Sequence, residues 1–411
     1  MTRWRQLRGV AQKTMPTRHQ FKTRTGRQPV VASRGWRDRK RYVWLLGLII
    51  PTLVPMSWLA VTVTGWGVFW WSGPTLMLLV IPALDYLVGP DAENPPDSAL
   101  TWLEHDRFYR WAIYLYLPAQ YLSLLLACWF WSGGGGVALS GLDKVGLMLT
   151  VGGIGGVAIN AAHEMGHQRA ESERWLSKVA LAQTGYGHFF VEHNRGHHAR
   201  VATPEDPASA RMGENIYFFH YRSILGSLRS ALALEHRRLA RGGKSAWTLR
   251  NDALNAWLMT IALFAALVLG FGIEVLPWLL GQAAIGIFLL ETINYLEHYG
   301  LRREQRSDGS YEHVRPSHSW NSNSIISNVF LFHLQRHSDH HANPRRRYQA
   351  LCHAEEAPQL PAGYATMVVV ALIPPLWRRV MDRRVLAHYD GDLRRTALSP
   401  RKARRLAKRY A

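Results

Sequence analysis

Six long apolar stretches constrain this chain more than any other feature of its sequence. Each has about the 20 residues that a helix needs to cross a hydrocarbon core of about 30 Å. They cover residues 42–63, 66–88, 111–131, 145–162, 253–273 and 275–296. Several begin or end with Trp or Tyr, which are typical of the membrane interface. The sequence therefore predicts an all-α integral membrane bundle of six transmembrane helices, rather than the soluble domains that its length alone would suggest.

The basic residues predict how this bundle is oriented. The formal net charge is +20, and 13 Lys/Arg lie in residues 1–42 and 12 in residues 378–411. Basic arms beside apolar spans suit an anionic membrane surface better than nucleic acid. Six spans put both termini on one side of the membrane, together with the long segment 163–252. Because cytoplasmic segments retain Lys and Arg, we expect a multi-pass protein of the bacterial inner membrane with this side in the cytoplasm.

The same pattern divides the chain into three parts. Residues 1–41 are predicted to be a basic, disordered cytoplasmic arm, residues 42–377 a catalytic membrane domain, and residues 378–411 a basic cytoplasmic tail. Within residues 364–386 the apolar run before Pro374 and Pro375 is too short to span. We expect an interfacial helix there, near the C-terminus.

Histidines carry the chemistry of the chain. It has 19 of them, and nine fall in four short boxes with the sequences HEMGH, EHNRGHH, NYLEHYG and LQRHSDHH. All four boxes follow the cytoplasmic ends of predicted spans. In the last box the i, i+3 and i+4 spacing predicts three rings converging on one point of a helix. The nine candidate metal ligands are His163, His167, His193, His197, His198, His298, His337, His340 and His341.

This ligand set favours a pair of transition metals. HEMGH alone resembles a zinc protease signature, which would need just one more ligand. Nine histidines exceed what one tetrahedral zinc could use, so two ions are expected, and imidazole nitrogen suits Fe, Cu or Zn rather than Mg or Ca. Four acids stand beside the boxes, namely Glu164, Glu192, Glu297 and Asp339. Their carboxylates could bind the metals, but we expect them instead to accept imidazole N–H groups and so fix the tautomers.

The boxes resemble those of the membrane-bound alkane 1-monooxygenases, the integral-membrane non-haem di-iron alkane hydroxylases. The resemblance rests on HEMGH, EHNRGHHARVATPEDPASAR, NYLEHYGL and LQRHSDHHANPRRRYQ. It extends to LDYLVGPDAENPP, GYGHFF and HSWNSN, and weakens in the basic ends. Bare histidine boxes are shared with fatty-acid desaturases and hydroxylases, whereas NYxEHYG and ATPEDPASAR are more specific.

The resemblance implies that O2 hydroxylates the terminal methyl of medium-chain n-alkanes at two non-haem irons, giving 1-alkanols. Electrons would come from NAD(P)H through rubredoxin reductase and rubredoxin. This chain lacks paired CxxCG motifs, so rubredoxin would be a separate partner, docking on a cytoplasmic surface rich in arginine. The arginines near the boxes are Arg200, Arg211, Arg345, Arg346 and Arg347. By position, the nine boxed histidines match the iron ligands of the family.

Substrate selection and the rival functions follow from the same layout. An alkane has no polar group to bind, so a narrow apolar tube between spans must present its end to the metals. Met77 and Ile81 on the second span are candidates for setting the depth of the tube.

A membrane fatty-acyl desaturase or hydroxylase, or an alkylaromatic methyl monooxygenase, would share the di-iron site. A metal transporter is disfavoured, because the spans carry few ionisable groups away from their ends.

Overall fold

The computed structural model describes residues 36–410, and every regular element in that range is a helix. Six helical segments are long and apolar enough to cross a membrane, which confirms the predicted all-α bundle. They are Val43–Thr64, Gly67–Val88, Arg107–Trp131, Gly141–Gly166, Asp252–Phe271 and Val275–His298. The bounds differ from the predicted ones by at most four residues. The second and third spans end where predicted, whereas the fourth and sixth continue past the apolar run to Gly166 and His298. Most of the predicted basic arm, residues 1–35, lies outside the described residues.

Only the last three spans are single unbroken α-helices. The first joins a 3-10 helix, Val43–Thr52, to α1 (Leu53–Thr64), and the second contains α2 (Ser72–Thr75) and α3 (Ile81–Val88). The third is made of α5 (Arg107–Tyr114) and α6 (Tyr116–Trp131). A π-helical turn, Leu76–Val80, interrupts the second span between α2 and α3. Such turns shift the register of side chains and are frequent at functional sites.

Helix α7 (Gly141–Gly166) is the central element of the bundle and the most buried span. It begins with a capping box between Ser140 and Asp143. It packs on α13 (Val275–His298), the second arm of the hairpin that starts with α12 (Asp252–Phe271). A Cβ atom on Gly152 would meet Ile285 Cβ at 2.6 Å, so the two helices approach more closely than larger residues would permit.

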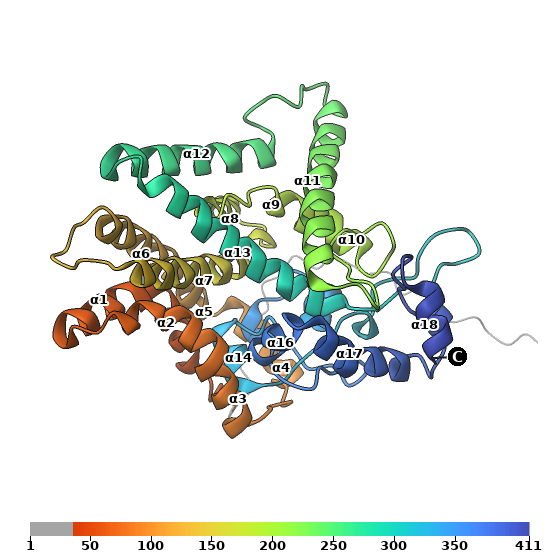
Figure 1. Ribbon diagram of the computed structural model, residues 1–411. Helices are drawn as coiled ribbons and strands as arrows, with labels where there is room; N and C mark the ends of the chain where they lie inside the picture. Colours follow the sequence, from red (N-terminus) through yellow and green to blue (C-terminus); the bar gives the residue numbers. More distant parts are fainter. Residues whose placement is uncertain (1–35, 411) are drawn as a thin grey trace, which may run out of the picture.

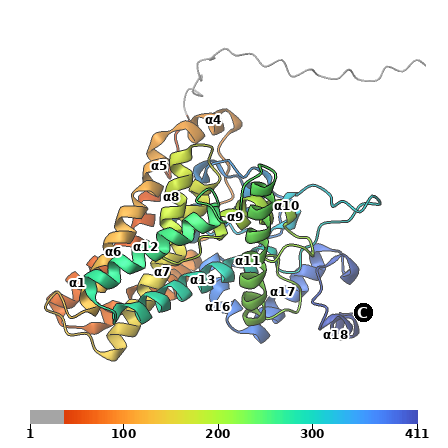
Figure 2. The same cartoon turned by 90° about the horizontal axis from the view of Figure 1, so that it is seen from above.

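Helices outside the six spans cover one end of the bundle. After α7 come α8 (Glu171–Ala182), α9 (Phe189–Glu192), α10 (His198–Arg200) and the long α11 (Ile216–Ala240). After α13 come α14 (Ile325–Phe330), α15 (His337–Ala342), α16 (Tyr364–Ala371), α17 (Pro374–His388) and α18 (Ala403–Tyr410). Figures 1 and 2 both show α16, α17 and α18 away from the tips of α1 and α6. The loops between spans at those tips are short.

The segment predicted as one interfacial helix is two helices. Ile373 separates α16 from α17, because Pro374 and Pro375 start a new helix and cannot continue the previous one. Helix α16 packs against the second span and α13, with Tyr364 and Val368 buried. Helix α16 therefore packs into the bundle, and only its outer face is free to lie at an interface.

Candidate metal centre

The nine boxed histidines meet at the end of the bundle where α7 and α13 finish. His163 lies in the last turn of α7, His167 directly follows that helix, and His298 is the last residue of α13. The other six come from the segments 193–198 and 337–341, which lie between these helix ends. Seven of the nine rings are buried, and His167 and His198 are half-buried. Residues separated by up to 177 positions are thus brought into contact.

The rings form two groups. Five present ligand atoms that all lie within 4.8 Å of one another, and a second set of four does the same. The first group, called here the five-histidine group, is His163, His167, His193, His198 and His340. The second, the four-histidine group, is His197, His298, His337 and His341. The last box therefore serves both groups, where the sequence had predicted a single point of convergence.

Local helix geometry explains this division. In α15, His337 and His341 are four residues apart and share a face, while His340 is turned toward the five-histidine group. Residues His193–His197 form a π-helical turn. Because a π-helix closes hydrogen bonds from i to i+5, His193 and His198 point to the same group and His197 points to the other. An ordinary α-helix would have paired His193 with His197.

The distances between ring nitrogens fit metal coordination. Nε2 of His163 lies 2.9 Å from Nε2 of His340, and Nε2 of His193 lies 3.1 Å from those of His167 and His198. In the four-histidine group, Nε2 of His337 lies 2.9 Å from Nε2 of His341 and 3.2 Å from Nε2 of His298. Two nitrogens bound at right angles to one ion, each at about 2.1 Å, would be about 3.0 Å apart.

The protonation of the rings also suits metal binding. Burial and the neighbouring imidazoles hold the pKa of His337, His340 and His341 well below the usual range, and the same holds for His167, His193 and His198. These rings are therefore neutral at pH 7 and offer free lone pairs. The buried Nε2 of His197 has no hydrogen-bond partner among the described residues. A cation in each group would satisfy these nitrogens.

Two outer contacts select the nitrogen that faces inward. Nδ1 of His197 donates to Oδ2 of Asp206 at 2.9 Å, and Nδ1 of His298 lies 3.2 Å from the carbonyl oxygen of His318. Both contacts leave Nε2 for the metal. Burial acts to raise the pKa of Asp206, but His197 and Ser209 lower it to about 2, so the carboxylate is ionised. Sequence reasoning missed Asp206, because it lies in a turn without periodic signal.

The four acids predicted to orient the rings differ in their contacts. Oε2 of Glu297 lies 3.2 Å from Nε2 of His337. Glu164 accepts from the backbone N–H of Tyr348, Glu192 pairs with Arg200, and Asp339 pairs with Arg346. Among the described residues, Glu297 and Asp206 are the only carboxylates within 4.0 Å of the nitrogens of the nine rings. An acid next to a boxed histidine in the sequence therefore need not contact the rings, because adjacent residues on a helix point in different directions.

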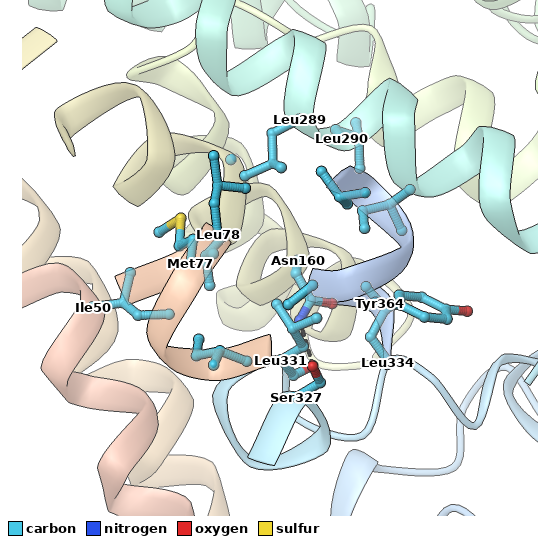
Figure 3. Close-up of a pocket in the computed structure, with 16 residues that line it drawn as sticks. Ile50, Met77, Leu78, Asn160, Leu289, Leu290, Ser327, Leu331, Leu334 and Tyr364 are labelled. Atoms are coloured by element: carbon cyan, nitrogen blue, oxygen red, sulfur yellow. Dashed lines mark hydrogen bonds between the residues drawn. The ribbon is translucent and has the colours of Figure 1, made fainter. Parts of the chain in front are cut away.

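Two cavities are relevant to this centre, and the basic one is lined by two of its histidines. One is apolar and lies between the second span, α7, α13 and α16; Met77, Ile81 and Leu289 are among its lining residues (Figure 3). Three other lining residues, Asn160, Ile293 and Leu334, precede a clustered histidine by five positions or fewer. The second cavity is lined by His167 and His198 together with Arg169, Arg174, Arg195 and Arg345. The basic cavity therefore opens onto the metal centre, and the apolar cavity lies within about two helical turns of its histidines along the chain.

Comparison with known proteins adds a family to this geometry. Residues 144–371 match the family model described as fatty acid desaturase. The alkane 1-monooxygenase of Acinetobacter baylyi is 44% identical over 388 residues, which cover 92% of this chain and 93% of that protein. Alkane 1-monooxygenase 1 of Alcanivorax borkumensis is 44% identical over 370 residues, 90% of each chain. The alkane 1-monooxygenase of Pseudomonas putida is 46% identical over 358 residues, 87% of this chain and 88% of that protein.

Proposed function

The chain belongs to the alkane 1-monooxygenases, within the fatty acid desaturase family, and from this membership we propose that it oxidises the terminal methyl of medium-chain n-alkanes to 1-alkanols. The balanced reaction is R–CH3 + O2 + NAD(P)H + H+ giving R–CH2OH + H2O + NAD(P)+. One oxygen atom enters the C–H bond and the other is reduced to water. The observation that carries this proposal is the pairing of two histidine groups beside an apolar cavity.

The nine clustered histidines would hold two iron ions, one in each group. The support is chemical: neutral imidazoles at metal-like separations suit iron better than Mg or Ca. When bound, the iron pair supplies reductive activation of O2. The chain's own part is to hold the rings, with Asp206 keeping a proton on Nδ1 of His197 and the His318 carbonyl doing the same for His298. Glu164, Glu192 and Asp339 would stabilise the segments that carry the ligands.

The apolar cavity would hold the end of the alkane. Its lining is almost wholly aliphatic, and Asn160, its nearest amide to the centre, already donates to the carbonyl of Leu331 at 2.6 Å. Met77 lies on the π-helical turn of the second span, facing Gly153, and Ile81 follows one turn later. We infer that these two side chains limit the depth of the substrate tube. Because the lining is apolar, a methyl group bound there would be desolvated.

Rubredoxin would deliver the electrons at the basic cavity. Arg169 and Arg345 line this cavity and form no ion pair within the described part of the chain. By contrast, Arg200, Arg346 and Arg347 pair with Glu192, Asp339 and Glu173. Free guanidinium groups beside His167 and His198 suit a small acidic protein carrying one metal centre. Rubredoxin reductase would then reduce rubredoxin from NAD(P)H.

The proposed location is the bacterial inner membrane, with both termini and the metal centre in the cytoplasm. The connections at the far end of the spans, residues 65–66, 132–140 and 272–274, contain no Lys or Arg. The arginine-rich segments all lie at the other end, as expected for cytoplasmic loops. In this proposal residues 1–41 and 378–411 flank the catalytic domain 42–377 as basic cytoplasmic segments.

Activity and metal content test the proposal together. We expect the purified protein to contain about two irons per chain and, with NADH, rubredoxin and its reductase, to convert octane to 1-octanol. His337→Ala should remove a ligand of the four-histidine group and abolish 1-octanol formation. His313→Ala, on an exposed loop residue outside both groups, is the matched control and should retain activity. Undiminished 1-octanol from His337→Ala, or a double bond formed in a fatty acyl-CoA, would refute it.

Chain-length preference tests the substrate tube. Met77→Ala should deepen the cavity and favour longer alkanes, with roughly a 4-fold gain for each further methylene that is buried. The measurement is the ratio of hexadecane to octane hydroxylation. Leu79→Ala, two residues away and 67% exposed on the outer face of the span, is the control and should not change that ratio. An unchanged ratio in Met77→Ala would contradict a role for Met77 in setting depth.

A further inference from the structure

Helix α11 has an apolar outer face that the described part of the chain leaves largely uncovered. Residues three and four apart share one side of a helix, and five residues at this spacing are all apolar or aromatic. They are Tyr217, Tyr221, Leu225, Leu228 and Leu232. Tyr221 is 66% exposed, and none of the five is buried. A continuous exposed face of this kind marks a contact surface for lipid or protein, whereas single exposed apolar residues are ordinary.

The loop that joins α11 to α12 exposes two more apolar side chains. Trp247 is 87% exposed and Leu249 is 71% exposed. The loop is held against the start of the span, because the side-chain amide of Asn255 on α12 donates to the carbonyl of Leu249 at 3.2 Å. Leu249 lies three residues before α12 begins. Trp is enriched at the membrane–water interface, so this position favours lipid as the contact of both side chains.

Helix α11 lies across the spans and touches one of them at membrane depth. Both views show α11 running across α12 and α13 (Figures 1 and 2). The ring of His220 on α11 lies 4.4 Å from the ring of Phe288 on α13, measured between centroids. Phe288 is itself exposed on the span and lies ten residues before its end, which is about 15 Å along the helix. The helix α11 therefore reaches the lipid-facing surface of the bundle.

The charges of this segment suit the same placement. Residues 216–250 contain seven Lys/Arg and one acid. Arg237 lies about 160° around α11 from Tyr221. Arg241 and Lys244 in the loop are exposed and form no ion pair with the described residues. We propose that α11 and the loop to α12 lie in the plane of the bilayer, with the apolar face at the boundary of headgroups and acyl chains and the basic groups among the lipid phosphates. The inference does not depend on which substrate the enzyme oxidises.

This interfacial element also supports the metal centre. Arg200, next to the second histidine box, donates to the hydroxyl of Ser230 on α11 at 2.6 Å. Arg195, inside that box, pairs with Glu235 on the same helix. The segment 193–198 is therefore fastened to α11, so contact with lipid would help to hold the histidines of this box in place.

Spin labels on the full-length protein test this placement, with one copy in each nanodisc of phosphatidylethanolamine and phosphatidylglycerol. The background is Cys352→Ser, in which the remaining Cys128 is buried. Labels are attached at Tyr221→Cys and Leu249→Cys, and at Arg237→Cys as the matched control on the opposite side of α11. The measurement is the accessibility of each label to O2, which concentrates among acyl chains, and to a nickel chelate, which stays in water. We expect the ratio of O2 to nickel accessibility to be at least about 5-fold higher at 221 and 249 than at 237, because the polar chelate is excluded from the acyl region.

Two results would overturn the inference. Labels at 221 and 249 that the nickel chelate reaches as easily as the label at 237 would place the apolar face in water. Labels that neither reagent reaches would mean that protein covers this face, from the chain itself or from a partner. If size-exclusion chromatography shows that Tyr221→Cys is misfolded, Leu232→Cys carries the test, because Leu232 is an exposed residue on the same face. Neither result would bear on alkane hydroxylation, which is measured separately.

Discussion

Each imidazole in the centre has two nitrogens, and the residue that holds the outer one decides where the inner one points. His197 illustrates this, because its Nδ1 is tied to Asp206, which is held in turn by the hydroxyl of Ser209 at 2.6 Å. The carboxylate is buried and ionised, so it accepts a hydrogen bond from the Nδ1–H of the ring and leaves Nε2 free. This arrangement requires a buried negative charge at Asp206, and in return it fixes one tautomer of His197.

Asp206→Asn should weaken metal binding at the four-histidine group. The amide can present its NH2 group to Nδ1 of His197 and so favour the wrong tautomer, and loss of such outer partners typically lowers metal affinity about 10- to 100-fold. The measurement is iron retained per chain across a chelator series. Asp308→Asn, in an exposed turn where Ser310 is its partner, is the control and should match the wild type. Equal iron retention by Asp206→Asn would show that His197 needs no such partner.

The candidate ligands could be identified from residue type alone, because nine histidines in four boxes exceed any packing need. Their division into two groups could not. The π-helical turn at His193–His197 has no signature that periodicity reveals, and it reverses the pairing that ordinary helical spacing predicts. Glu297 could be identified as a neighbour of His298, but only the three-dimensional contact with His337 distinguishes it from Glu164.

At the scale of elements, the separation of α7 and α13 sets the distance between the two groups. His163 and His167 come from α7, and His298 comes from α13. The GGIGG sequence at 152–156 permits close packing of the two helices, since a side chain at Gly152 would strike Ile285 and the backbone of α13. The ends of the fourth and sixth spans were predicted less well, because α7 and α13 continue through polar histidines and glutamates to Gly166 and His298.

Gly152→Leu should force these two helices apart. Overpacking of this kind costs about 1–3 kcal/mol and here displaces ligands on both sides of the centre. We expect a lower thermal unfolding midpoint and reduced iron per chain. Gly141→Leu, at the exposed start of α7 where a Cβ meets nothing within 4 Å, should change neither quantity. Normal iron content in Gly152→Leu would mean that the ligand segments fold independently of this contact.

At the scale of the whole molecule, all nine histidines lie at one end of the bundle, as an even number of spans requires. Hydropathy predicted the six spans and their order, because the bilayer permits few alternatives. The docking of α16 into the bundle was not predictable from its length, since a short apolar helix can lie on a membrane or inside a protein. Its burial of Tyr364 closes one wall of the apolar cavity.

Reporter fusions test the orientation of the molecule. A fluorescent protein fused to the C-terminus should be bright, because it would fold in the cytoplasm. Alkaline phosphatase inserted at Gly135, in the 132–140 connection, should be active, because that connection would face the periplasm. Phosphatase inserted at Gly243, between α11 and α12, should be inactive and serves as the opposite-side control. The reverse pattern would put the metal centre outside the cytoplasm.

The two cavities beside the metals share no lining residue. In the proposed function, the hydrocarbon would therefore enter through the apolar cavity from the lipid, and the electrons would arrive at the basic cavity from the aqueous side. The alkane would not have to pass through water, the electron-carrying protein would not have to enter the lipid, and a bound alkane would not block the docking of that protein. Such an arrangement would let a cell work on a fuel that barely dissolves in water without ever bringing that fuel into the cytosol.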